Sequence, residues 1–187
     1  MIFRNDDVNF NTEKKHLSAI YGTIHDIFPN SEIWSGITLF AQHNTIKAIY
    51  GDLPLKTKET NWFYKNADSF MHDYRHPMYK VASHGLFHVD HSSISKDAQE
   101  MSILGSCSYL NSKIFVPPFN KFNQDTVDIC FDNEITLDPH GWRSLEYSPF
   151  DPTHKKWYFH SWRFTPNQLK DVLLGNIFVN KDSSFLG

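Results

Sequence analysis

The chain has 187 residues, of which 40% are hydrophobic and 16% aromatic, and its formal net charge at pH 7 is -3. A chain of this length can bury one sizeable core, so we expect a single globular domain over residues 1–187. The small negative charge argues against a nucleic-acid partner, because no surplus of Lys and Arg is available to contact phosphates. The sequence contains no apolar run long enough to be a transmembrane segment.

The N-terminus and the cysteines give an expectation about the compartment. Residues 1–5 lack the basic region and apolar stretch of a secretory signal. Cys107 and Cys130 are too few for a disulfide framework and have no zinc-ribbon spacing. These features predict a cytoplasmic protein. Eleven histidines favour metal or proton-transfer chemistry without proving either.

Strands and helices are predicted to alternate from the N-terminus. Residues 1–8 resemble a short buried strand, which ends in a pair of aspartates. Residues 12–28 carry apolar side chains at helical spacing, with Asn11 or Thr12 as the expected cap. Residues 33–40 are β-branched and aromatic, which is typical of a second strand.

Residues 41–76 form a long excursion without a clear periodic pattern. Loops of this length inside a compact domain are usually functional or contain small elements of their own. The aromatic group at residues 62–64 has two interpretations, a wall that stacks on sugars or a set of ordinary core residues.

The second half continues the alternation and ends in a helix. We expect strands at 79–82, 113–116, 134–137 and 156–159, and helices at 95–110, 123–130 and 165–174. Ser95 is the expected cap of the first of these helices, and Pro117 and Pro118 stop the strand before them. The order of the elements predicts an α/β fold with a largely parallel sheet.

Polar residues follow the predicted strands repeatedly: Asp6 and Asp7, His84 and His88, Asn120, Asp138, and His160. Active sites of α/β proteins are assembled at the carboxyl ends of the strands. Each residue alone also has a structural explanation, such as a solvated turn or a hydrogen-bonded histidine. Their joint occurrence at strand ends favours an active site.

His84 and His88 have the spacing of metal ligands. On a helical turn, residues four apart face the same side. A zinc site usually needs a third protein ligand, with an open position for water if it is catalytic. The aspartate pair at the end of the first strand is the obvious donor, so we expect the two segments to meet at one metal ion.

These residues resemble the motifs of a known family, the metal-dependent polysaccharide deacetylases, in family order over nearly the whole chain. Asn5-Asp6-Asp7 matches the first motif, with Val8 where a glycine is usual, and His84 to His88 matches the second. Residues 115–120 resemble the third motif, an arginine-proline-proline-aromatic turn, but lack its arginine. The aspartate–tryptophan fourth motif is loosely matched by Asp138 and Trp142. Residues 157–160 resemble the fifth, a histidine after an apolar strand.

The resemblance implies a distorted (β/α) barrel with fewer than eight mostly parallel strands. It also implies roles for particular residues. Asp7, His84 and His88 would hold a divalent metal, most often zinc, Asp6 would be the general base and His160 the general acid. The substrate would contact Pro118, Asn120 and Trp142.

Physical chemistry sets one condition on these roles. Adjacent side chains of a regular strand point to opposite faces, so Asp6 and Asp7 can share a site only if the strand has ended there. Two imidazoles and a carboxylate leave metal positions free for water and substrate. Asn9 or Asn120 is expected to orient a ligand from behind.

Three functional hypotheses follow. The first is a deacetylase that removes an N-acyl group, preferentially acetyl, from an amino sugar; a nucleotide-linked or lipid-linked precursor of a surface polysaccharide would suit a cytoplasmic enzyme. The second is a catalytically degenerate carbohydrate-binding module, suggested by the missing arginine. The third is a metal hydrolase of another bond, such as an ester or a formamide. The oligomeric state is not predicted.

Overall fold

The computed structural model describes residues 1–9, 12–39, 79–138 and 140–177. The predicted excursion at 41–76, including the aromatic group at 62–64, lies outside the described residues. The helices are α1 (Lys14–Ile27), α4 (Lys96–Leu110), α5 (Gln124–Asp132) and α6 (Pro166–Leu173), with short 3-10 turns η1 (His91–Ser93), η2 (Pro118–Asn120) and η3 (Ser161–Arg163). The strands are β1 (Ile2–Val8), β2 (Glu32–Ile37), β3 (Lys80–Ser83), β4 (Ile114–Phe115), β5 (Thr136–Leu137), β6 (Arg143–Ser144) and β7 (Lys156–Phe159).

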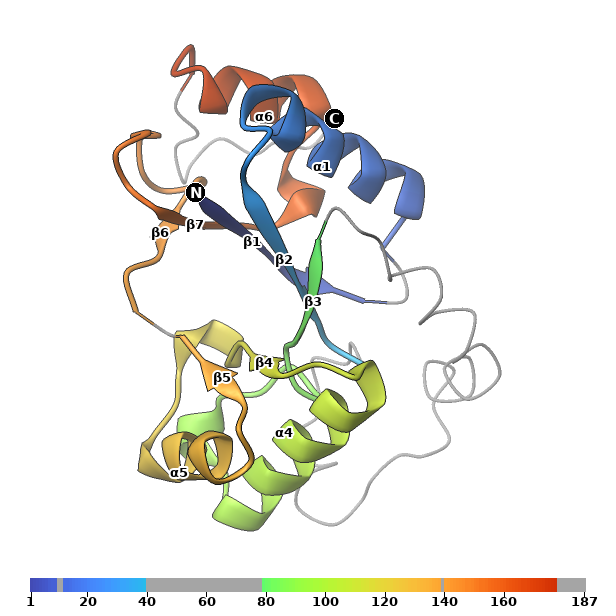
Figure 1. Cartoon of the computed structure of the whole chain (residues 1–187), viewed down its shortest axis with the longest axis vertical. Coiled ribbons are helices and arrows are strands. Elements are labelled where there is room, and N and C mark those ends of the chain that lie inside the picture. The colour runs from blue at the N-terminus through green and yellow to red at the C-terminus, as the bar shows by residue number, and fades with distance from the viewer. Residues whose placement is uncertain (10–11, 40–78, 139, 178–187) are drawn as a thin grey trace.

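The described strands form one seven-stranded sheet in the order β5-β4-β3-β2-β1-β7-β6, and every pair in it is parallel. The sheet is curled, and its two halves, β1, β2, β7 and β6 on one arm and β3, β4 and β5 on the other, are each covered by helices (Figure 1). The predicted α/β fold, a distorted barrel with fewer than eight parallel strands, is confirmed. Because all strands run the same way, their carboxyl ends meet at one edge.

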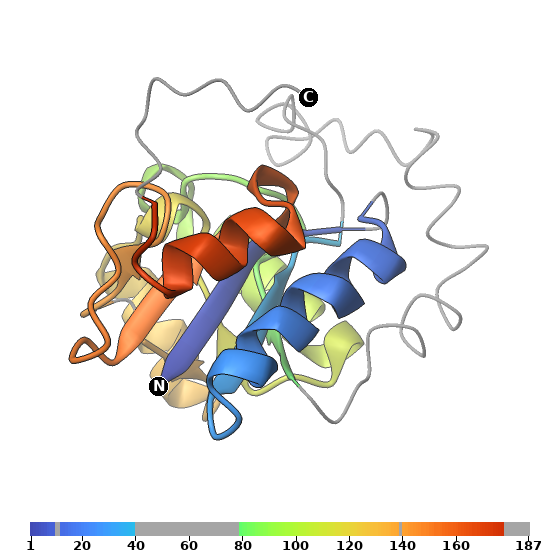
Figure 2. The ribbon, with the colours of Figure 1, turned by 90° about the horizontal axis from the view of Figure 1, so that it is seen from above.

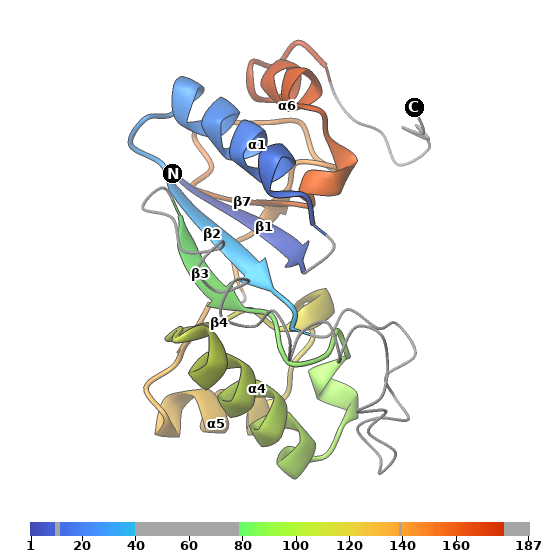
Figure 3. The same ribbon diagram turned by 90° about the vertical axis from the view of Figure 1, so that its right-hand side faces the viewer.

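Two groups of helices cover the sheet, one on each arm. The helices α1 and α6 lie side by side over β1, β2 and β7 (Figure 2), whereas α4 and α5 pack together below β3, β4 and β5 (Figure 3). The larger core joins fully buried Ile20 and Ile24 of α1 to Phe3, Ile33 and Trp157 of the strands. Burial of each such side chain stabilises the fold by about 1.5–3 kcal/mol.

Most predicted helix ends agree with the structure. Ser95 caps α4 by accepting a hydrogen bond from Ala98 N–H, and Thr165 caps α6. The predicted cap of α1 is wrong, because the helix begins after Glu13, whose side chain makes no capping bond. The two-residue strand β6 was not predicted, since so short a segment carries no periodic signal. Within the described residues, no helix has the length and apolar character needed to cross a membrane.

Candidate metal-binding active site

The end of β1 is irregular at the aspartate pair. The pairing of β1 with β2 shifts between Asn5 and Val8, and Asp7 adopts a left-handed backbone with φ of 61°. The strand therefore bulges rather than ending at this point, which removes the strict alternation of its side chains. Asn9 supports the bulge by donating from its side-chain amide to Asp7 O at 2.9 Å.

The neighbouring strand β2 leaves room for this bulge at Gly36. A Cβ atom at Gly36 would lie 3.3 Å from Asp6 Oδ1 and 3.4 Å from Asn5 O. Such contacts are tighter than ordinary packing. The glycine thus lets the aspartate pair lie close to β2.

His84 and His88 lie in the loop after β3, not on the helical turn that the spacing suggested. The loop turns at Gly85, whose φ is 87° and whose missing Cβ would be 2.9 Å from Phe87 O. His84 Nδ1 donates to Val116 O at 2.7 Å. This bond places the proton on Nδ1 and leaves Nε2 with a free lone pair.

Asp7, His84 and His88 converge on one point. One ligand atom from each lies within 4.8 Å of the others. Asp7 Oδ1 is 2.8 Å from His88 Nε2 and 3.3 Å from His84 Nε2. That oxygen is buried, and the described residues give it no well-directed hydrogen bond. The Asp7 carboxylate, whose buried oxygen lacks a hydrogen bond from the described residues, and the two imidazole nitrogens beside it form a ligand set that fits a zinc ion.

The protonation state of Asp7 suits a metal ligand. Burial raises the pKa of its carboxyl group, but contacts with the His84 and His88 imidazoles outweigh burial and hold the pKa well below its usual value. Asp7 is therefore a carboxylate at neutral pH, which is the form that binds cations.

Asp6 is held by an arginine from its own strand. Arg4 Nε and Nη2 each donate to a different oxygen of Asp6 at 2.8 Å, and Nη2 also donates to Asn120 Oδ1 at 2.8 Å. The Arg4 side chain is fully buried, and its guanidinium carbon lies 4.6 Å from the ring centroid of Trp142 and 5.4 Å from that of Tyr158. A bidentate pair of this kind fixes the plane of the carboxylate.

His160 faces Asp7 from the end of β7. Its Nε2 is 3.4 Å from Asp7 Oδ2, and its Nδ1 donates to Glu146 Oε1 at 2.7 Å. Glu146 is buried and also lies 3.2 Å from Arg163 Nε. Burial lowers the pKa of His160, but Glu146, with Asp6 and Asp7, outweighs burial and raises it. His160 is thus held in its protonated form over a wider pH range.

The remaining predicted site residues lie near this cluster in different ways. Pro118 begins η2, and Asn120 in the same turn is occupied by Arg4. Trp142 packs on Arg4 and donates through Nε1 to Asp138 O at 2.8 Å. Asp138 itself forms an ion pair with Lys156.

Two site residues, Arg4 and Glu146, were not anticipated from the sequence. Arg4 precedes the aspartate pair by two positions, and this spacing places it on the same face of β1 as Asp6. Glu146 follows β6, so it is another acid after a strand, but that strand was not recognised. Both residues are charged but buried, and a buried charge needs a partner.

Solved structures with the same architecture share this arrangement of strands and helices. A CE4 family pseudoenzyme from Bacillus anthracis matches 96% of this chain and 62% of its own length, with a TM-score of 0.56 and 11% identity. A family 4 carbohydrate esterase from Streptomyces lividans matches 91% of this chain and 82% of its own, with a TM-score of 0.54 and 9% identity.

The chain has the fold of the family 4 carbohydrate esterases. The peptidoglycan deacetylase PdaC from Bacillus subtilis also matches, over 96% of this chain and 85% of its own, with a TM-score of 0.53 and 8% identity. The predicted resemblance is therefore confirmed at the level of the fold. Comparisons with protein-family models and with curated proteins find no match. The chain spans 62% of the length of the pseudoenzyme, and at such low identity its chemistry must be argued from its own residues.

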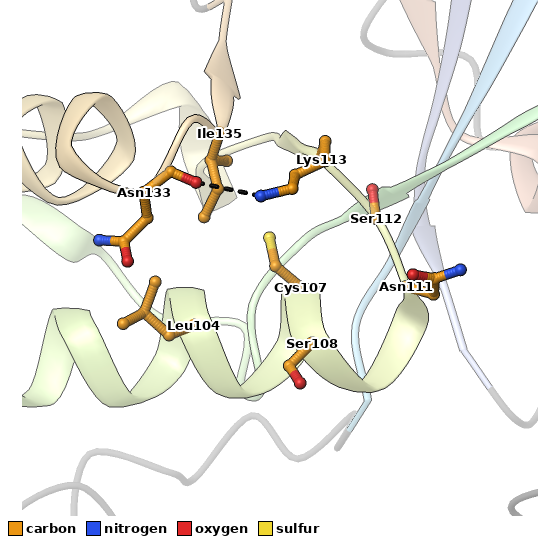
Figure 4. Close-up of a pocket in the computed structure, with 8 residues that line it drawn as sticks. All are labelled: Leu104, Cys107, Ser108, Asn111, Ser112, Lys113, Asn133 and Ile135. Atoms are coloured by element: carbon orange, nitrogen blue, oxygen red, sulfur yellow. Dashed lines mark hydrogen bonds between the residues drawn. The ribbon is translucent and has the colours of Figure 1, made fainter.

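This family 4 fold also contains a hollow away from the candidate site, beside α4 (Figure 4). Lys113 and Asn133, which line it, precede β4 and β5, so the hollow lies at the opposite end of these strands. Among the described residues that line the hollow, none has a carboxylate or an imidazole side chain. Burial raises the pKa of the Cys107 thiol there to about 11, so this thiol is neutral. The hollow is therefore separate from the cluster of titratable side chains at the carboxyl edge.

The first prediction concerns metal content. Wild-type protein should bind about one zinc ion per chain, whereas Asp7→Ala and His84→Ala should each retain less than about a tenth of it, because two ligands make a weak site. Metal analysis after dialysis against zinc measures this. His140→Ala, at an exposed histidine, is the matched control and should bind as wild type. Equal zinc in all four proteins would contradict the site.

The second prediction concerns Arg4. Arg4→Met leaves the buried Asp6 carboxylate without its partner, which should reduce the free energy of unfolding by about 3–5 kcal/mol. Adding Asp6→Asn removes the uncompensated charge, so the double variant should be more stable than Arg4→Met alone. Urea unfolding of the four proteins of this cycle measures the coupling. Strictly additive losses would mean that the pair is not coupled.

The third prediction concerns the support of the histidine loop. Ser102 Oγ accepts from Leu86 N–H at 3.2 Å and bonds to buried His91 Nε2 at 3.3 Å, while His91 Nδ1 donates to Val89 O at 3.1 Å. Burial lowers the pKa of His91 from 6.5 to about 4. Burial therefore favours the neutral form of this ring at neutral pH.

The unfolded chain binds this proton below about pH 6.5, and the folded protein does not until about pH 4. Metal-free protein should therefore lose about 3 kcal/mol of stability through His91 as the pH falls across this window, with no effect above it. Urea unfolding at several pH values measures the slope. His91→Gln has no titrating group, so its slope should be shallower by about one proton, and an unchanged slope would refute the assignment.

Proposed function

We propose that this chain is a metal-dependent hydrolase that removes an N-acetyl group from an amino sugar. The observation that carries the proposal is the convergence of Asp7, His84 and His88 beside Asp6 and His160 at one edge of the sheet. This set combines a place for a metal, a carboxylate base and an imidazole acid, which amide hydrolysis requires. We propose that residues 1–187 act as one catalytic domain.

The candidate residues divide the work of amide cleavage. A zinc ion bound by Asp7, His84 and His88 would supply Lewis acidity, polarising a carbonyl group and lowering the pKa of a water molecule. Asp6, held in one orientation by Arg4, would accept the proton of the attacking water. His160 would donate a proton to the departing amine through Nε2, because its Nδ1 is engaged by Glu146.

The degenerate-module hypothesis has one comparison in its favour, since a structural neighbour is a pseudoenzyme. It rested on the missing arginine of the third motif and on a weak fourth motif. Arg4 provides a guanidinium to Asp6 from a different strand, and Glu146 provides a carboxylate to His160. Because the proposed base and acid each have a charged partner, we favour the active enzyme.

The type of bond that is cleaved, the substrate and the cellular compartment of the reaction stay predictions from the sequence. A metal site of this kind can also hydrolyse esters and formamides. Mass analysis of products from N-acetyl, N-formyl and O-acetyl sugars separates these reactions. The predicted substrate, a nucleotide-linked or lipid-linked precursor of a surface polysaccharide in the cytoplasm, belongs to the same set of predictions.

The fourth prediction tests the activity. Zinc-loaded wild type should release acetate from N-acetylglucosamine oligomers, and Asp6→Asn and His160→Gln should each lower kcat by about 10²–10⁴-fold, because each removes one proton-transfer group. Both variants should keep their zinc, since neither is one of the three proposed ligands. Asp97→Asn, an exposed carboxylate in the first turn of α4, is the matched control. Equal background release by wild type and Asp6→Asn would favour the binding module.

A further inference from the structure

A short row of polar side chains crosses the apolar core between α1 and the sheet. Asn5 and Ser35 are fully buried, and Tyr21 and Ser161 are each 1% exposed. Burying a polar group away from water is costly unless it finds a hydrogen-bond partner. Apolar side chains would fill the same space without that cost, so the row calls for a reason other than packing.

The row is one chain of hydrogen bonds that ends beside the proposed acid. Tyr21 Oη lies 3.0 Å from Ser35 Oγ, and Asn5 Nδ2 donates to Tyr21 Oη at 2.8 Å. On its other side, Asn5 Oδ1 accepts from Ser161 N–H at 2.8 Å. Because a backbone N–H can only donate, the amide of Asn5 must lie with its oxygen toward Ser161. Partners on both sides thus fix this amide.

The two ends of the Asn5 bond are next to the two proposed proton-transfer groups. Asn5 directly precedes Asp6 in β1, and Ser161 directly follows His160. Side chains alternate along a strand, so Asn5 faces α1 whereas Asp6 faces the opposite side. The bond therefore joins the strand of the proposed base to the turn after the proposed acid, from outside the site.

This bond lies where the backbone ladder between β1 and β7 stops. Their pairing ends at Asn5 and Phe159, and the register of β1 with β2 shifts directly after Asn5 at the bulge. Among the described strand pairs, none therefore ties Ser161 to β1. The side-chain oxygen of Asn5 takes the place of a main-chain acceptor and continues the connection by one step.

Ser161 and His160 are held by further bonds. Ser161 O accepts from His16 Nε2 of α1 at 2.9 Å, so both backbone polar groups of Ser161 have partners. The backbone N–H of His160 donates to Glu146 Oε1 at 2.8 Å, and its ring Nδ1 donates to the same oxygen. The place of the His160 ring is thus set from both ends of its residue.

We propose that Asn5 is a positioning residue for the proposed proton donor, because its bond to Ser161 N–H sets where His160 lies relative to Asp6. The inference rests on the proposed function and adds to it a residue outside the site. Proton transfer needs the donor within hydrogen-bond reach of the leaving atom, and a displacement of about 1 Å can lower a rate roughly 100-fold. If Asn5 only completed the polar row, its loss would affect stability and not catalysis.

The test begins with the zinc-loaded full chain carrying Asn5→Leu, which removes the acceptor at similar volume. The kcat for acetate release from N-acetylglucosamine oligomers should fall about 10- to 100-fold, and KM should change by less than about twofold. Zinc content should stay at the wild-type level, since none of the three proposed ligands is altered.

A double-mutant cycle shows whether Asn5 acts through the acid. Added to His160→Gln, Asn5→Leu should lower kcat by less than about threefold, because the group that it positions is already absent. Ser161→Pro removes the donor of the same bond. Proline suits this place, because Ser161 is the first residue of η3 and His160 before it is extended. Its loss of kcat should match that of Asn5→Leu, and the two losses should not add.

Two further variants keep the result specific. Gln99→Leu removes another fully buried amide, whose Nε2 donates to Ile94 O at 3.1 Å on the other arm, and it should leave kcat unchanged. Asn5→Asp keeps an oxygen for Ser161 N–H and should recover most of the lost kcat. Additive losses with His160→Gln, an equal loss in Gln99→Leu, or loss of zinc from Asn5→Leu would each overturn the proposal.

Hydrogen exchange of the Ser161 amide tests the contact without using activity. Its exchange should be at least about tenfold faster in Asn5→Leu than in wild type, because the bond that protects it is absent. Unchanged exchange in an active enzyme would refute the role of Asn5 alone. No acetate release by wild type would instead refute the proposed function, and the role of Asn5 with it.

Discussion

The bulge at the end of β1 is the constraint on which the candidate site depends. In a regular strand Asp6 and Asp7 would point to opposite faces, and only one would reach the carboxyl edge. The left-handed residue at Asp7 breaks that alternation and aims its carboxylate at the two histidines, while Asp6 stays paired with Arg4. Aspartate is one of the few residues besides glycine that adopts this conformation readily, so the residue type at position 7 suits both the bulge and the site.

Arg4 connects the bulge to the rest of the carboxyl edge. Its guanidinium binds Asp6 on β1 and Asn120 on η2, and it is enclosed by the rings of Trp142 and Tyr158. An isolated buried charge would be very unfavourable, whereas a bidentate pair with further hydrogen bonds offsets the desolvation. One buried side chain therefore fixes the orientation of the proposed base and holds the turn η2 beside it.

The sequence predicted the alternation of strands and helices, the parallel sheet and the strand ends at which polar residues gather, because these follow from apolar periodicity and chain direction. The sequence also predicted that Asp7, His84 and His88 would meet, and the structure places them together. The local reason differs, because a turn at Gly85 rather than a helix makes the imidazoles converge. Glu146 was missed because the short strand before it carries no periodic signal and its partners, His160 and Arg163, come from a later segment. Arg4 was missed although its spacing from Asp6 puts both on one face of β1, because spacing alone does not show that the pair is buried.

The two buried ion pairs bear on whether the site is active or degenerate. A domain that only binds sugar has no need to keep a fully buried arginine against Asp6, or a buried glutamate against His160, since each pair costs desolvation and adds little net stability. A catalyst does need them, because proton transfer depends on a fixed base and on an imidazole whose pKa is raised by a neighbouring carboxylate. Arg4 on β1 gives Asp6 a guanidinium partner although the proline turn has no arginine, so the missing arginine is weak evidence against the proposed catalysis.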